Sequence, residues 1–62
     1  MTTKLKNGAI QIERKGNTVL ALWEGHHHPY VTWRINEQGD TYLGHYFEDV
    51  VEAVRDFDQR AN

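Results

Sequence analysis

TYLGHYFEDVVEAVRDF, residues 41–57, holds the change of hydrophobic period that decides the fold. Up to Phe47 the side chains alternate between two faces, with the period of two that is typical of a strand. After Asp49 the apolar residues recur at helical spacing, at Val50, Val51, Val54 and Phe57. Asp49 also begins a capping-box pattern, because an acidic residue follows it three positions later. The stretch therefore predicts a strand that is followed by a helix over about residues 49–60.

Three earlier stretches of the chain predict strands. They lie around residues 10–13, 18–23 and 30–35, and loops containing glycine or proline separate them. The expected fold class is α+β: an antiparallel β-meander of three or four strands with one C-terminal α-helix packed on one sheet face. Residues 1–8 are predicted to form a flexible N-terminal arm, and residues 9–62 a single small α+β domain.

The alternation of the third strand assigns the two faces of this sheet. Val31, Trp33 and Ile35 share one side, and we expect them to form a core with the helix. The other members of this core are predicted to be Ile10, Ile12, Val50, Val54 and Phe57. Residues 18–23 are apolar on both sides, which is typical of a central strand covered on both faces. The sequence leaves open which side of that strand meets the helix.

One three-turn helix covers only one side of such a sheet, so the opposite face is predicted to lie uncovered. We expect this face to bind a partner, through Tyr30, Thr32, Arg34, Tyr42 and Tyr46. Aromatic residues and arginine are enriched at the centres of protein interfaces. A homodimer that packs sheet to sheet would cover the face, although the preference of tyrosine for strands explains part of the pattern.

Charge divides the chain into two halves. Residues 1–35 carry five basic and two acidic residues, a net charge of +3, and residues 36–62 carry two basic and seven acidic residues, a net charge of −5. On the predicted helix Glu48, Glu52 and Asp56 form an acidic face. This face either keeps the protein in solution or attracts a basic partner surface.

Composition argues against several classes of function. The chain has no cysteine and no serine, so the two commonest nucleophiles are missing, and the absence of cysteine fits a reducing cytoplasm. The longest unbroken apolar run, residues 19–23, is far too short to span a membrane. The first six residues lack the apolar stretch of a signal peptide. We therefore expect a cytoplasmic protein that is not an enzyme, with no membrane contact and no cofactor.

The histidines are the remaining candidates for chemistry. His26 and His28 lie in a loop before Pro29 and point to the same side of an extended chain, so they and His45 are the weak candidates for a metal site. The preferred interpretation is that no metal is bound and that His45 is a buried structural histidine. Gly44, beside it, is expected to let a bulky ring such as a tryptophan pack against the backbone.

Residues 42–61 also resemble part of a known class of DNA-binding domain. Tyr42 to Asp49 followed by Glu52 to Asp58 is similar to the last strand, acidic cap and helix of the three-stranded-sheet-plus-helix domains of the ethylene-response type and of phage integrase arm-binding domains. The resemblance implies a sheet that lies in the major groove, with Arg34 and Arg14 at phosphates or bases. Those families place more Arg and Trp residues on the reading face than this chain offers.

The sequence thus predicts a small, non-catalytic interaction module. We expect a stand-alone regulatory or inhibitory protein, of phage or mobile-element type, that binds a protein partner or a second copy of itself. DNA binding through the sheet face is the alternative.

Overall fold

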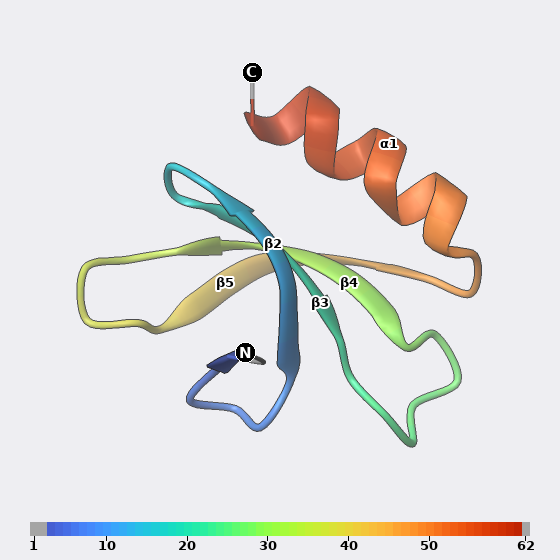
Figure 1. The fold of residues 1–62 in the computed structure, drawn as a ribbon, viewed down its shortest axis with the longest axis horizontal. Coiled ribbons are helices and arrows are strands. Elements are labelled where there is room, and N and C mark those ends of the chain that lie inside the picture. The colour runs from blue at the N-terminus through green and yellow to red at the C-terminus, as the bar shows by residue number, and fades with distance from the viewer. Residues whose placement is uncertain (1–2, 62) are drawn as a thin grey trace.

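The computed structural model describes residues 3–61 as one antiparallel sheet and one helix. The elements are β1 (Thr3–Lys4), β2 (Ile10–Lys15), β3 (Thr18–Leu22), β4 (Tyr30–Ile35), β5 (Thr41–Phe47) and α1 (Val50–Ala61). Each strand pairs with its neighbours in the chain, so the order in the sheet also runs from β1 to β5. Figure 1 shows a strongly twisted sheet with α1 across one side. The predicted α+β meander with a C-terminal helix is confirmed, with five strands in place of three or four.

The fifth strand comes from the segment predicted to be an arm. Thr3 pairs with Gln11, and Lys4 pairs with Ile10. A tight turn follows, in which the Leu5 N–H donates to the Ala9 carbonyl at 2.8 Å. Residues 1 and 2 of the predicted arm lie outside the described residues.

This N-terminal segment also reaches the hairpin that joins β4 to β5. Asn7 Nδ2 donates to Thr41 Oγ1 at 3.2 Å, and Lys6 Nζ lies 3.5 Å from Asp40 Oδ1. Leu5 between them is buried. The segment therefore closes over the face of the sheet that points away from α1, which we call the inner face.

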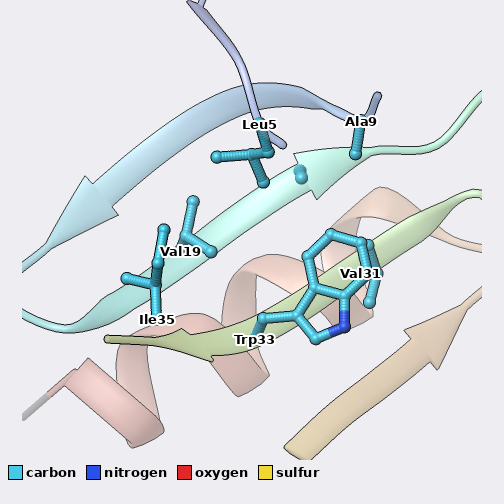
Figure 2. Packing of buried hydrophobic residues seen from close by; sticks show 7 residues of the cluster. Leu5, Ala9, Val19, Val31, Trp33 and Ile35 are labelled. Carbon is cyan, nitrogen blue, oxygen red and sulfur yellow. The ribbon is translucent and has the colours of Figure 1, made fainter. Parts of the chain in front are cut away.

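The inner face holds the larger of two cores. Val19, Ala21 and Val31 are fully buried there, and Trp33 and Ile35 are nearly so. Figure 2 shows Val19, Val31, Trp33 and Ile35 grouped with Leu5 and Ala9 on the side of the sheet opposite α1, and Ala21 belongs to the same cluster. The prediction that one sheet face lies uncovered is therefore wrong, because the curled sheet and the N-terminal segment cover it within one chain.

The smaller core lies between the sheet and α1. It consists of Leu20, Ala53 and Phe57, with Tyr30 and Phe47 packed against them. The helix thus lies on the side of β4 that carries Thr32, and the prediction that it covers Val31, Trp33 and Ile35 is wrong. The alternation of residues along β4 defines its two faces, but it does not say which of these faces packs against the helix.

The helix also presents a different stripe from the predicted one. Of the predicted apolar residues only Phe57 is buried, whereas Val50, Val51 and Val54 are 38%, 55% and 39% exposed. Asp49 Oδ1 accepts the Val51 N–H at 2.9 Å, as expected of a helix N-cap. Within residues 3–61, no helix is long and apolar enough to span a bilayer.

Strand β3 is central and buried on both faces, as its sequence predicts. Thr18 to Ala21 are all buried, and β3 is third of the five strands. The open question about its register is settled: Leu20 packs with α1, while Val19 and Ala21 belong to the inner face. Ile12 is the extra residue of a bulge in β2 and is 48% exposed, so it does not join either core.

A second irregularity lies in β5. Thr32 pairs with His45 and Arg34 with Tyr42, so Leu43 and Gly44 together face Trp33. Leu43 has a φ of 52°, in the left-handed region that residues with a side chain rarely adopt. A Cβ on Gly44 would lie 2.7 Å from Trp33 Nε1, which confirms the prediction that this glycine admits a bulky ring.

Candidate functional site

A polar cluster of Thr32, His45, Asp56 and Arg60 joins the sheet to α1. Thr32 Oγ1 donates to Asp56 Oδ2 at 2.5 Å, and His45 Nδ1 lies 2.9 Å from the same oxygen. Arg60 Nη1 donates at 3.0 Å to both the carbonyl oxygen and Oγ1 of Thr32. Arg60 Nη2 donates at 2.6 Å to the carbonyl oxygen of Leu43, inside the β5 bulge. The cluster therefore ties α1 to β4 and β5 at once.

The charges of the cluster favour an ionised Asp56. Its side chain is 19% exposed, and this partial desolvation raises the pKa of the carboxyl. The hydrogen bond from Thr32, the hydrogen bond and charge of His45 and the charge of Arg60 act in the opposite direction. Together they outweigh the desolvation and hold the pKa of Asp56 below its usual value.

The pair of His45 and Asp56 has the arrangement of a general base and its orienting carboxylate. Thr32 is the only hydroxyl of the cluster, and it is fully buried. Its proton is directed at Asp56, and its oxygen accepts from Arg60. A substrate has no access to this hydroxyl, so the geometry is that of a structural clamp.

The sequence does not predict this clamp. Its pattern predicts an exposed acidic face for Asp56 and a buried position for His45, but Asp56 faces the sheet and the His45 side chain is 54% exposed. A signal was present in the i, i+4 spacing of Asp56 and Arg60. The buried hydroxyl that explains this spacing belongs to Thr32, which donates to Asp56 and accepts from Arg60 and lies 24 residues before Asp56.

The residues predicted for partner binding do not form one surface. Thr32 lies beneath α1, and Tyr30 packs in the smaller core. The guanidinium of Arg34 donates to Thr18 Oγ1 at 2.7 Å and to Asn17 Oδ1 at 3.3 Å. The β5 bulge shifts the alternation, so Tyr42 shares a face with Arg34 whereas Tyr46 lies on the inner side opposite Val31.

The predicted acidic face is also divided. Glu48 and Glu52 are exposed, whereas Asp56 belongs to the polar cluster. The carboxylate of Glu48 lies 3.6 Å from His28 Nδ1.

The three candidate metal ligands are not brought together. The ring of His26 packs against Trp23, with ring centroids 4.1 Å apart, while His28 faces Glu48 and His45 faces Asp56. Within residues 3–61, no group of three or more His, Cys, Asp or Glu side chains is placed to hold a metal ion.

A hollow of about 320 Å³ opens beside Trp23. Its lining residues are Lys4, Gly8, Ile10, Leu22, Trp23 and Glu24. The two charged residues of the lining, Lys4 and Glu24, are of opposite sign. The hollow shares no residue with the polar cluster.

Exposed apolar side chains gather on two elements. The β5 strand exposes Tyr42, Leu43 and Tyr46 by 46%, 68% and 49%. The helix exposes Val50, Val51 and Val54, which we call the valine flank. The sequence predicts Val50 and Val54 as core because their spacing matches a buried helical stripe.

No protein-family model, no curated protein and no solved structure matches this chain. The resemblance of residues 42–61 to DNA-binding domains stays a prediction.

Proposed function

We propose that the protein is a small, non-catalytic interaction module whose valine flank binds a basic, partly apolar segment of a protein partner. The observation that carries the proposal is the exposure of three valines side by side on α1.

The orientation of α1 places the valine flank clear of β5. Asp56 points to His45 on β5, and Ala53 and Phe57 point to the sheet. At 100° per residue, Val50 and Val54 fall on the side of α1 opposite Asp56, towards β3, and Val51 lies next to them and further outwards. The flank is therefore a continuous strip along the first two turns of the helix.

These valines have no role in the stability of the isolated helix. A β-branched residue costs up to about 0.7 kcal/mol relative to alanine in a helix interior. Burial offsets this cost only in part, because Val50, Val51 and Val54 remain 38%, 55% and 39% exposed. Since much of their apolar surface stays in water, a bound partner is a role that fits their position.

The charges around the flank define the chemistry of that partner. Glu48 and Asp49 precede the first turn and Asp58 follows Val54 by one turn, and these three acidic residues outnumber the basic Arg55, which follows Val51 by one turn. All three carboxylates belong to exposed residues. A segment with apolar residues on one side and lysine or arginine beside them would satisfy both the valines and the carboxylates.

The proposal is tested by titrating two synthetic peptides into isotope-labelled protein. One peptide places leucine and lysine at helical spacing, and the other has glutamate in place of lysine. We expect the lysine peptide to shift the amide signals of residues 48–58 and to bind more weakly as salt increases. The glutamate peptide should not bind.

A double variant, Val51→Gln/Val54→Gln, should bind the lysine peptide about tenfold more weakly, a loss of about 1.4 kcal/mol. The control Tyr42→Gln removes an exposed apolar side chain of β5 and should bind like the original protein. Equal binding of both peptides, or equal binding by the double variant, would contradict the proposal.

DNA binding has less support from the geometry. The inner face is apolar and closed, with Trp33 only 3% exposed, and the Arg34 guanidinium is occupied by Thr18 and Asn17. Phosphate binding requires a stripe of available basic groups. We expect no retardation of duplex DNA at low salt, and retardation that weakens steeply with added salt would favour the alternative.

A further inference from the structure

The two edges of the sheet are unequal. Edge strand β1 has two residues and carries Lys4, whereas edge strand β5 has seven. At about 3.4 Å per residue β5 is about 24 Å long. The longest extent of the molecule is 28 Å, so this edge runs along most of one side.

The β5 edge lacks most of the features that keep edge strands from pairing. Monomeric proteins protect long edges with charged residues, proline, bulges or a covering segment. Thr41 to Phe47 contains no Asp, Glu, Lys, Arg or Pro. Two features limit pairing there: the bulge at Leu43 and Gly44, and Arg60 Nη2, which donates to the Leu43 carbonyl oxygen. The N-terminal segment contacts β5 through Thr41, at the start of the strand.

Apolar side chains stand on both faces of this edge. Tyr42 lies on the face that carries α1 and Tyr46 on the inner face, and each is about half exposed. An added strand would find an aromatic cross-strand neighbour on either side.

We propose that β5 pairs antiparallel with β5 of a second copy of this chain, so that one sheet runs through a twofold-symmetric dimer. This surface lies across α1 from the valine flank and rests on a different observation, the unprotected edge.

Symmetry and charge identify the second copy as the occupant. Pairing of β5 with the β1 edge of another molecule would engage only two residues of β1, whereas β5 against β5 offers up to seven residues of each strand, interrupted at the bulge of Leu43 and Gly44. A twofold axis closes such an assembly at two chains. Thr41 to Phe47 contains no Asp, Glu, Lys or Arg. Two paired β5 strands therefore do not place two such residues of the same charge opposite each other.

The helices make the dimer dependent on salt. An antiparallel pair of strands has its twofold axis perpendicular to the sheet, so both α1 helices lie on the same face. Glu52, one turn before Asp56 on the side towards β5, then approaches its counterpart across the axis. Added salt screens this repulsion, so the dimer should strengthen with salt whereas peptide binding at the valine flank weakens.

Sedimentation velocity over a wide range of protein concentration tests the proposal. We expect the mass to rise from 7.3 kDa towards twice that value, and the dimer fraction to increase with salt. The amide signals of residues 41–47 should shift with concentration, and their hydrogen exchange should slow.

Two variants and a control locate the interface. Tyr42→Lys and Leu43→Lys each place a charge on the edge at an exposed position, and each should lower the dimer fraction at least tenfold. Gln38→Lys adds the same charge in the exposed loop before β5 and should dimerise like the original protein. The valine-flank variant Val51→Gln/Val54→Gln should also dimerise normally, which separates this proposal from the preceding one.

A mass of one chain at every concentration would overturn the pairing. A dimer that both edge variants leave intact would overturn it as well, because the contact would then lie elsewhere.

Discussion

Replacing Asp56 by alanine tests whether the polar cluster holds α1 on the sheet. The change removes the acceptor of the Thr32 hydroxyl and the partner of His45. Loss of a partner for a buried hydroxyl costs about 1–3 kcal/mol. The half-exposed His45 adds little. We therefore expect a total loss of about 2 kcal/mol from the free energy of unfolding.

For a domain of this size, 1 kcal/mol shifts the unfolding temperature by about 4–8 °C. The variant should thus melt roughly 8–16 °C lower than the original protein. Thermal and urea unfolding can be followed by tryptophan fluorescence, because Trp33 passes from the buried inner face into water. The denaturant slope should stay unchanged, since the surface exposed on unfolding is nearly the same.

The contribution of Asp56 to the free energy of unfolding should change with pH in a defined direction. The pKa of Asp56 is lower in the folded protein than in the unfolded chain, so its ionised form stabilises the fold. This contribution is complete above about pH 4, the usual range of a carboxyl, and disappears as the pH falls through the lower pKa of the folded state. The stability difference between the two proteins should therefore shrink in acid.

Asp58→Ala is the matched control. Asp58 is exposed on the same helix and carries the same charge, so its removal should change stability by at most about 0.5 kcal/mol. Equal destabilisation by the two substitutions would refute the reasoning, because general charge on α1 and not the cluster would then be responsible. A difference that persists unchanged at low pH would refute the assignment of an ionised Asp56.

Three further substitutions test the fold. Gly44→Ala places a Cβ 2.7 Å from Trp33 Nε1 and 2.9 Å from Tyr46 Cε1, so it should destabilise by about 1–3 kcal/mol in urea unfolding; unchanged stability would mean that the ring does not lie against the backbone. Leu5→Ala should cost about 2 kcal/mol or more and speed hydrogen exchange in β1 and β2, whereas a neutral result would show that the N-terminal segment does not seal the inner face. Asp49→Ala removes the helix N-cap and should cost about 0.5–2 kcal/mol in thermal unfolding, and Asp49→Asn, which keeps an acceptor, should recover most of it.

The elements could be predicted from the sequence because their signals are local. Alternation marks β4, the change of period marks the start of α1, and Asp49 marks its cap. The two-sided apolar character of β3 correctly indicated a central strand.

The pairing of faces could not be predicted, because it depends on contacts between distant residues. The helix takes the face of Thr32 because Asp56 accepts the hydrogen bond of the Thr32 hydroxyl and Arg60 donates to the same hydroxyl oxygen, across 24 and 28 residues of chain. The spacing of the valines is typical of a buried helical stripe. The polar contacts of Asp56 and Arg60 with Thr32 instead set the rotation of α1 about its axis. The bulge at Leu43 then divided Tyr42 from Tyr46, and no local rule marks a leucine for a left-handed conformation.

The uncovered sheet face failed as a prediction for a related reason. It assumed a flat sheet with only α1 to cover it, but twist and the burial of Leu5 close the inner face. A single leucine within a polar segment gives no hydrophobic periodicity, so the sequence predicts a flexible arm for residues 1–8.

The contact between the N-terminal segment and the β4–β5 hairpin bears on the kinetics of folding. All strand pairs join neighbours in the chain, so each hairpin can form by closing a short loop. The hydrogen bond from Asn7 to Thr41 and the ion pair of Lys6 with Asp40 span 34 residues each. Closing so long a loop costs chain entropy, and the contacts that offset this cost can form only when the sheet has already curled. These contacts should therefore form after the transition state, so that weakening them accelerates unfolding and leaves the refolding rate almost unchanged.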